Sequence, residues 1–306
     1  MRSSERTSWL LLLLVLVLAV GEIRPTAAQE PRGEHLALRS NPPAPRVRPV
    51  GLAAYPILVG APAVSESDRQ FDQLVSEFLP AYFRAEPVRA SALGFHEYDA
   101  LFPATDSAGI AAWAAELDGY RARLSRLDPY QLRPGRRKDH AVLTGHIERE
   151  LRDLRAGGAW QRDPGYYLAI ASEGIHALVD SGSTPPANWT WNVVARLWLM
   201  PGLFHDARAN LEDPSLAAAQ RAVDPSAELV RFLANELPAR VAPLRDNVLR
   251  EEFEHHLASA SGAAAEYHYW LRTEVVPHAA PDSAGDSAAR GASAAFASAL
   301  DSLLGR

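Results

Sequence analysis

The chain has 306 residues and a formal charge of −6, from 31 Lys and Arg against 37 Asp and Glu. This acidic balance excludes a nucleic-acid-binding protein, because neutralising phosphates requires a basic surface. The absence of cysteine excludes disulfides, thiolate metal sites, thiol catalysis and a lipid-modified cysteine.

The first 28 residues predict a signal peptide. Arg2 and Arg6 precede an apolar run from Trp9 to Val20, which is too short to span a bilayer comfortably. Small residues at positions 26–28 predict cleavage directly after them. An uncleaved N-terminal anchor remains the alternative. We therefore expect an exported protein, periplasmic or secreted, that is free of the membrane once the signal is cleaved.

Residues 29–65 predict an extended, proline-rich and disordered tether. Seven prolines lie between Pro31 and Pro62. Each proline lacks an amide donor and fixes its own φ, so this stretch can form neither a helix nor a central strand. The remaining residues, 66–306, are expected to form one helical domain.

The first half of this domain shows helical periodicity. Ser67 and Gln70 predict a capping box at the start of a helix. A second predicted helix follows Asp106 and ends at Asp128, before a proline, and a third ends at residues 157–158. A fourth starts at Asp163, again before a proline. The apolar residues of the first helix recur at steps of three and four: Phe71, Leu74, Val75, Phe78, Leu79 and Tyr82.

Residues 188–200 are apolar on nearly every side, which predicts a helix in the middle of a bundle. Its tryptophans, at 189, 191 and 198, are expected in the core, with a peptide-binding shelf as the alternative. Pro201 predicts the start of a separate short helix. Further helices are predicted at 225–238, at 243–259, around Tyr267–Leu271 and at 296–304. No segment alternates with a period of two, so the fold class is an all-α multi-helix bundle.

Three stretches carry a resemblance to a known family. In order they are Glu86-Pro87-Val88-Arg89-Ala90-Ser91-Ala92-Leu93-Gly94 with Tyr98-Asp99, then Arg162-Asp163-Pro164-Gly165-Tyr166-Tyr167, and then Ala195-Arg196-Leu197-Trp198-Leu199-Met200-Pro201, which runs into Ala207–Leu211 and Asp213-Pro214. Together they resemble the N-terminal half of the bacterial domain of unknown function 885 family, from about Asp68 to the C-terminus.

This resemblance implies an exported, helical protein related to zinc peptidases of the gluzincin type, whose all-α fold is split by a long cleft. In an intact relative, Tyr166 and Tyr167 could line that cleft. It also implies a zinc-site helix of the type His-Glu-x-x-x-x-His in the C-terminal half of the family. The chain ends at Arg306, before that helix is expected, so it resembles the N-terminal half only. No catalytic, cofactor-binding or metal-binding residue is therefore carried over from the family to this sequence.

The residues themselves supply no complete catalytic motif. His-Glu-x-x-His is absent, and His96-Glu97 is followed by Ala100 where the second imidazole would stand. Glu252 and His256 lie one helical turn apart, with His268 twelve residues further on. They could bind a cation, although a solvated charged helix face explains the same pattern. His140 and His146 lie six residues apart, too far round a helix to converge on one ion.

Other catalytic signatures are equally incomplete. There is no Gly-x-Ser-x-Gly elbow, and Ser181-Gly182-Ser183 lies in a loop bounded by proline without a helix start behind it. No glycine-rich phosphate loop is present. Asn188-Trp189-Thr190 matches an N-glycosylation sequon, a pattern that often arises by chance.

Two functional hypotheses follow. The first is an inactive N-terminal half of a zinc-peptidase-like protein, whose partner polypeptide supplies the missing C-terminal half. The second is a non-catalytic periplasmic module that binds a peptide or a protein partner. A half-domain should expose a large apolar face and aggregate, whereas a true module should fold cooperatively as a soluble monomer. An independent metal enzyme using Glu252, His256 and His268 is the third and least supported alternative. No cofactor is expected.

Overall fold

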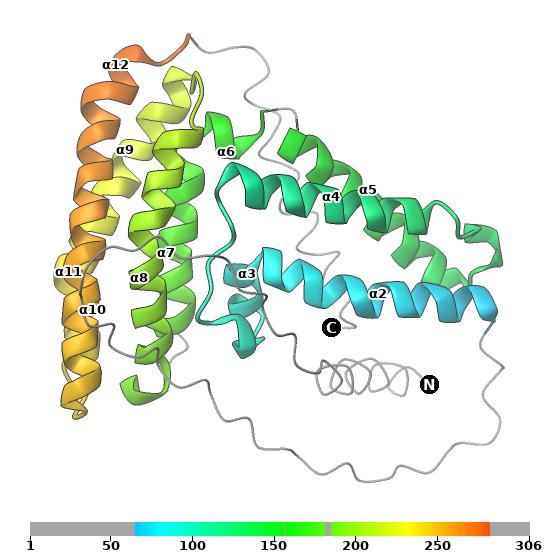
Figure 1. The fold of residues 1–306 in the computed structure, drawn as a ribbon, viewed down its shortest axis with the longest axis horizontal. Helices are drawn as coiled ribbons and strands as arrows, with labels where there is room; N and C mark the ends of the chain where they lie inside the picture. Colours follow the sequence, from blue (N-terminus) through cyan, green and yellow to red (C-terminus); the bar gives the residue numbers. More distant parts are fainter. Residues whose placement is uncertain (1–64, 156, 181–184, 282–306) are drawn as a thin grey trace, which may run out of the picture.

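The structure, a computed structural model, describes residues 65–155, 157–180 and 185–281. Within these ranges the regular elements are helices, and the one β-bridge pairs Ser215 with Ala280. The chain is thus all-α, as the sequence predicts (Figure 1). The predicted signal peptide, nearly all of the tether, the loop at 181–183 and the last predicted helix at 296–304 lie outside the described residues. Among the described helices, none combines the length and the apolar composition that crossing a bilayer requires.

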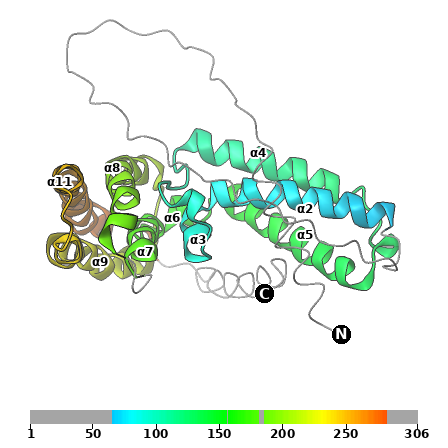
Figure 2. The ribbon, with the colours of Figure 1, turned by 90° about the horizontal axis from the view of Figure 1, so that it is seen from below.

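A three-helix bundle forms the N-terminal part of the described chain. Its long helices are α2 (Glu66–Ala85), α4 (Ser107–Leu124) and α5 (Pro134–Arg155), which lie side by side in Figures 1 and 2. The face of α2 that the periodicity predicts is the buried face. Its core consists mainly of Phe71, Leu74, Val75, Phe78, Leu79, Tyr82, Leu117, Tyr120, Leu124, Leu143, Ile147 and Leu151.

The start of α2 differs in detail from the sequence prediction. The N-cap is Ser65, whose hydroxyl accepts a hydrogen bond from the Asp68 amide at 3.0 Å. Ser67 instead donates to Gln131 at 3.0 Å. Asp68 is fully buried and accepts from the Arg133 amide at 3.1 Å and from its guanidinium at 2.8 Å. These bonds fasten the start of α2 to the loop before α5.

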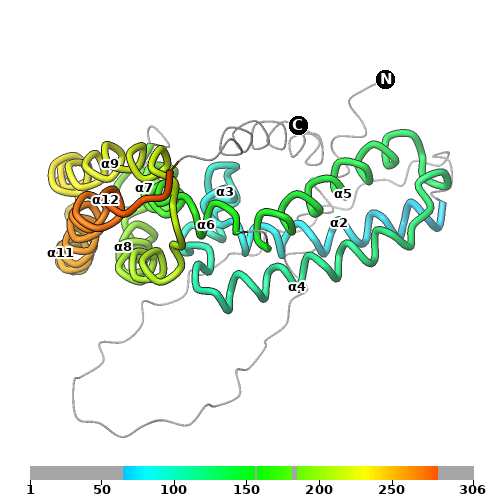
Figure 3. The backbone as a smooth tube through the Cα atoms, turned by 90° about the horizontal axis from the view of Figure 1, so that it is seen from above, coloured from blue at the N-terminus to red at the C-terminus, as the bar shows by residue number. Residues whose placement is uncertain are grey.

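A second bundle forms the C-terminal part. It contains α7 (Gly165–Val179), α8 (Pro186–Asn210), α9 (Leu216–Arg231), α10 (Leu237–Val241), α11 (Asn247–Trp270) and α12 (Val276–His278). Its long helices run across the direction of the first bundle and appear end-on in Figure 3. Helix α8 packs between α7 and α11 and contributes more residues to the shared core than any other helix.

Two prolines that predict helix starts lie inside helices instead. Pro201 lies within α8, which runs without a break from Pro186 to Asn210. Pro225 lies within α9. A proline interrupts a single i to i−4 hydrogen bond, and the buried residues on both sides of each proline hold these helices together. Tertiary packing therefore overrides the local signal that a new helix starts at each proline.

Two short π-helical segments interrupt the α-helical geometry within the second bundle. They are η3 (Phe232–Glu236), between α9 and α10, and η4 (Leu271–Val275), between α11 and α12. The Leu237 amide donates to the Phe232 carbonyl, the i to i−5 bond of a π turn. Each segment ends two residues before a proline, Pro238 or Pro277. Because a proline ring clashes with the carbonyl four residues earlier, a widened turn relieves that clash.

Short elements connect the two bundles. They are α3 (Pro87–Ala92), η1 (His96–Tyr98) and α6 (Ala159–Arg162), whereas η2 (Pro129–Gln131) joins α4 to α5 within the first bundle. Helix α3 packs against α7, so the segment that follows α2 reaches into the second bundle. Arg196 of α8 is fully buried here and donates to Ser91 and to the Leu101 carbonyl, both in the segment that connects the bundles.

Candidate functional site

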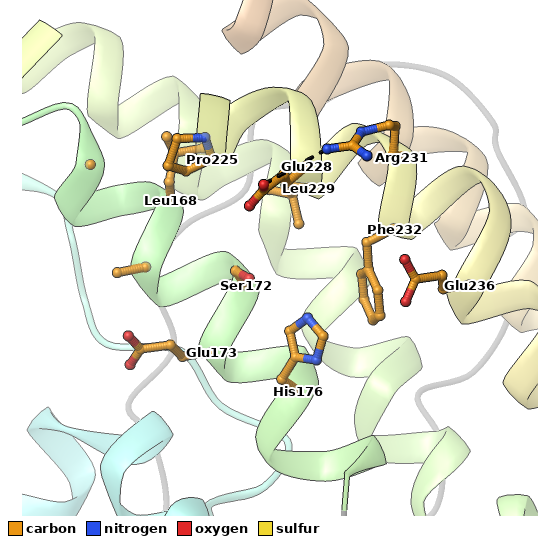
Figure 4. Close-up of a pocket in the computed structure, with 12 residues that line it drawn as sticks. Leu168, Ser172, Glu173, His176, Pro225, Glu228, Leu229, Arg231, Phe232 and Glu236 are labelled. Carbon is orange, nitrogen blue, oxygen red and sulfur yellow. Dashed lines mark ion pairs between the residues drawn. The ribbon is translucent and has the colours of Figure 1, made fainter. Parts of the chain in front are cut away.

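An open groove of about 530 Å³ runs between α7 and the continuous rod of α9 and η3 (Figure 4). Pro225 and Leu168 lie at one end of it, and His176, Phe232 and Glu236 lie at the other. The lining residues are Gly165, Leu168, Ala169, Ser172, Glu173 and His176 of α7, with Pro225, Glu228, Leu229, Arg231, Phe232 and Glu236 opposite.

The groove exists because small residues of α7 face α9. Gly165, Ala169 and Ser172 follow one another at steps of four and three, so they share one face of the helix. Short side chains on that face leave space that larger ones would fill. Leu229 and Phe232 are buried beneath this space. The floor of the groove is therefore apolar.

The rim of the groove is acidic. Glu173, Glu228 and Glu236 are exposed lining residues, and Arg231 is the one cationic group of the lining. Arg231 lies 3.8 Å from Glu228 and balances that carboxylate. Two carboxylates, Glu173 and Glu236, remain without a balancing cation in the lining. The groove thus offers an apolar floor flanked by negative charge.

His176 lies at the end of the groove formed by η3. Its ring packs on Phe232 with centroids 4.3 Å apart, and its Nδ1 lies 3.0 Å from Asp180 Oδ2. Arg240 donates to Asp180 at 2.5 Å and fixes that carboxylate in turn. Ser172 lies one turn before His176, but among the described residues no hydrogen bond joins the two. The contacts hold the imidazole in place and do not assemble a nucleophile with its base.

The residues considered for a metal site are not brought together. His256 lies 3.7 Å from Glu252 within α11, and burial, followed by the neighbouring His255, lowers the pKa of His256. His268 lies three turns further along α11, where its Nδ1 is 2.7 Å from Ser226 Oγ of α9. No group of three or more potential ligands converges within the described residues.

The other histidines have separate partners. His96 stands in the turn after Gly94, as predicted, with its Nδ1 3.0 Å from Asp99. His140 and His146 are both buried in the first bundle. The His140 ring lies 3.1 Å from the Leu124 carbonyl, and His146 lies 2.9 Å from Glu150.

Tyr166 and Tyr167, which could line the cleft of an intact relative, lie outside this groove. Tyr167 is buried and donates to the Trp160 carbonyl at 2.6 Å, while Asn210 donates to the Tyr167 hydroxyl at 3.0 Å. The Tyr166 ring packs edge-on against Tyr167 with centroids 5.1 Å apart. Neither side chain lines the groove between α7 and α9.

The expectation that all three tryptophans of α8 lie in the core is wrong for two of them. Trp189 is buried, as predicted. Trp191 is 40% exposed and Trp198 is 65% exposed. The reason is that α8 buries one broad face between α7 and α11, whereas these two residues lie on the opposite face.

A half-buried polar cluster at the junction of the bundles does not follow from the sequence patterns. Glu150 of α5 lies 2.9 Å from His146 and accepts a hydrogen bond from Trp113 at 2.6 Å. Burial, with Glu150 nearby, raises the pKa of Glu86 to about 8, against the opposing effect of Arg89. The members of this cluster lie far apart in the sequence. Their spacing therefore gives no pattern from which the cluster could be predicted.

Comparisons with known proteins define the family. The sequence model of the family described as "Bacterial protein of unknown function (DUF885)" matches residues 87–303, which is more than half of the chain. A search of curated proteins finds no match.

One solved structure shares the fold. It is that of a protein from Shewanella oneidensis described as "a putative lipoprotein of unknown function", at 23% sequence identity and a TM-score of 0.62. The match covers 66% of this chain and only 37% of that protein. The family match covers residues 87–303, and the all-α architecture agrees with it. The chain therefore belongs to the DUF885 family of bacterial proteins of unknown function.

Proposed function

We propose that this protein is a non-catalytic helical binding module. In this proposal, the groove between α7 and α9 holds a polypeptide segment that carries apolar and basic side chains. The observation that carries the proposal is the combination of a buried apolar floor, at Leu229 and Phe232, with unbalanced carboxylates at Glu173 and Glu236.

The dimensions of the groove support a polypeptide ligand. Its volume of about 530 Å³ lies in the usual range of ligand-binding sites. It is open to solvent rather than closed into a cavity, so an extended chain could enter from the open side. Apolar side chains would cover Phe232 and Leu229, and a lysine or arginine would pair with Glu236 or Glu173 at the rim.

The absence of catalysis is part of this proposal. Support comes from the histidines weighed as ligands, which have separate partners: His256 pairs with Glu252 and His268 contacts Ser226. His176 is held by Asp180 and Phe232. Each imidazole contributes to local packing rather than to a shared centre.

We also propose the ancestry of the protein and its location in the cell. The solved relative extends well beyond the matched region, since that region is 37% of its length. This supports the other hypothesis, in which the chain is one part of a larger fold completed by a further polypeptide. The zinc-peptidase-like ancestry rests on the sequence resemblance alone. Export rests on the pattern of the first 28 residues, and a periplasmic or secreted location follows from it.

The proposal predicts charge-dependent peptide binding by the full chain. A labelled peptide of alternating lysine and leucine should bind in fluorescence anisotropy, and its glutamate–leucine counterpart should not. Replacing both Glu173 and Glu236 with glutamine should weaken binding by about 3- to 10-fold, since exposed ion pairs contribute up to about 1 kcal/mol each. Raising the salt concentration should weaken binding further.

A matched variant separates the groove from the overall charge. Glu251 and Glu254 are exposed on α11, outside the groove, and replacing both with glutamine gives the same change in net charge. This control should bind the lysine–leucine peptide as the parent does. Equal losses in both double variants would mean attraction by the acidic protein as a whole and would refute a binding site between α7 and α9.

A further inference from the structure

The outward face of α8 forms an apolar surface on the second bundle. Trp191 and Trp198 stand on it, 40% and 65% exposed, with the half-buried Ala195 between them and the exposed Gly202 beyond. These positions follow at steps of four, three and four, so they form one stripe along the helix. We name these four residues the α8 stripe. Exposed tryptophans in one continuous patch mark interaction surfaces, because indole burial contributes strongly to association.

The α8 stripe carries no charge over its length. From Trp191 to Gly202 its members are aromatic or small, and the next exposed residue on this face is His205. The exposed positions of α9, in contrast, include Glu228 and Arg231. A helix face that meets only water usually carries charged side chains. The composition of the stripe is that of a covered face.

The surface around the α8 stripe is well defined. The segment between η1 and α4 runs alongside α8, where Asn192 lies 3.5 Å from Asp99 and Thr105 donates to Asp206 at 2.8 Å. Leu101 of this segment is 41% exposed. It adds apolar surface beside α8, while α11 packs along the helix on its other side. The stripe is thus a fixed feature, suited to an ordered occupant.

The C-terminal segment of the same chain has the composition that this surface fits. Residues 291–300 read Gly-Ala-Ser-Ala-Ala-Phe-Ala-Ser-Ala-Leu and contain no charge. Phe296, Leu300, Leu303 and Leu304 are spaced for one helix face. The family match extends to residue 303, so this segment belongs to the matched domain although it lies outside the described residues.

The described chain ends where this segment can reach the stripe. Ala280 donates to the Pro214 carbonyl at 3.0 Å and accepts from the Leu216 amide at 2.8 Å, close to the C-terminal end of α8. From Asn210 back to Trp198 the distance along the helix is about 18 Å, at 1.5 Å per residue. Residues 282–290 can span up to about 30 Å when extended. A helix over 296–304 would be about 12 Å long, against about 10 Å from Trp191 to Trp198.

We propose that residues 291–304 bind the α8 stripe, with Phe296 and Leu300 packed against Trp191 and Trp198. The small residues on either side allow close approach to the indole rings. The assignment is independent of the groove between α7 and α9, which lies on other helices of the bundle (Figure 1).

Cysteine cross-linking tests this proposal in the full chain, which has no cysteine of its own. A Cβ at Gly202 meets nothing within 4 Å, so Gly202→Cys fits without strain. Combined with Ala299→Cys and oxidised at low protein concentration, it should form a disulfide within one chain. Loss of both free thiols in the monomer, seen by mass spectrometry and on a non-reducing gel, is the expected result.

The matched control places the first cysteine on another helix. Gly262 of α11 is also exposed, and a Cβ there also meets nothing within 4 Å. It lies eight residues before the end of α11, as Gly202 does in α8. Gly262→Cys with Ala299→Cys should oxidise at least about tenfold more slowly, because only a docked segment has a high effective concentration at the stripe.

The alternatives give different results. Equal rates in the two double variants would indicate random encounters and overturn the proposal. Disulfides between chains would assign the stripe to a second copy of this chain and also overturn it. A second readout is truncation after Pro281. This should increase acrylamide quenching of tryptophan fluorescence in the parent but not in a Trp191→Phe, Trp198→Phe variant, and unchanged quenching in the parent would contradict the proposal.

Discussion

Replacing Arg196 with methionine is expected to lower the free energy of unfolding by about 3–5 kcal/mol. The substitution removes a buried charge and leaves its hydrogen-bond acceptors buried without a donor. Urea denaturation at pH 7, followed by circular dichroism, measures this change. We expect the transition to move to lower urea concentration by one molar or more, on the order of ΔΔG divided by a slope of about 2–3 kcal/mol/M.

The reason is the position of Arg196 between the second bundle and the segment that connects it to the first. Its side chain is completely buried in α8, and its ring contact is Phe102, whose centroid lies 5.7 Å from the guanidinium carbon. Burial lowers its pKa to about 10, with Asp99 opposing the shift, so the group keeps its charge at neutral pH. The guanidinium donates to Ser91 Oγ at 2.7 Å and to the carbonyls of Leu101 at 3.0 Å, Tyr98 at 3.4 Å, Pro87 at 3.5 Å and Gly174.

An exposed arginine provides the control. Arg126→Met, at the end of the first bundle, should change the free energy of unfolding by less than about 0.5 kcal/mol. If Arg196→Met were as stable as Arg126→Met, the guanidinium would contribute nothing to the connection between α8 and the segment from Pro87 to Leu101.

A second large effect is expected from pH. The free energy of unfolding should fall by about 3–4 kcal/mol between pH 5 and pH 8 through Glu86 alone, since each pH unit over which the folded chain holds one more proton corresponds to about 1.4 kcal/mol. Burial raises the pKa of Glu86 from 4.5 to about 8 in the folded chain, and Glu150 adds to the rise. Above pH 4.5 the unfolded chain releases this proton while the folded chain retains it. Stability is therefore lost as pH rises through this window.

The Glu86→Gln variant isolates this contribution. It should show a flatter dependence of stability on pH between 5 and 8 than the parent, because the side chain no longer titrates. Glu148→Gln, an exposed change on α5, should leave the dependence of the parent unaltered. The groups facing Glu86 are Tyr82, Arg89, Glu150 and Tyr166, all of which stay in place in both variants. Parallel curves for the parent and Glu86→Gln would show that Glu86 ionises freely in the folded chain.

Much of the fold follows from local patterns in the sequence. The apolar steps from Phe71 to Tyr82 predict the buried face of α2, and the structure buries each of those residues. Asp106 caps α4 through its side chain, in agreement with the predicted start of that helix. These features depend on neighbours within one or two turns, which is the range over which a sequence pattern carries information.

The errors concern features that depend on tertiary packing. Pro201 and Pro225 predict helix starts, but the packing of buried residues on both sides of each proline keeps α8 and α9 continuous. Trp198 is apolar enough for a core, yet the described structure leaves it 65% exposed. Neither outcome can be derived from residues nearby in the chain.

The groove was missed because it is formed by two helices far apart in sequence. The small residues Gly165, Ala169 and Ser172 give one usable signal, since their steps of four and three indicate a face where α7 leaves space. Nothing in the sequence indicates that Phe232 and Glu236 stand opposite that face. Their placement depends on the π turn before Pro238, which the helical pattern alone does not predict.

The claim that the groove between α7 and α9 binds a polypeptide is tested most directly by hydrogen exchange on the full chain, with and without the lysine–leucine peptide. We predict slower amide exchange in residues 165–176 and 225–237 when the peptide is present, and unchanged exchange in α2, α4 and α5. Protection confined to other segments, or uniform across the chain, would contradict the assignment of the site.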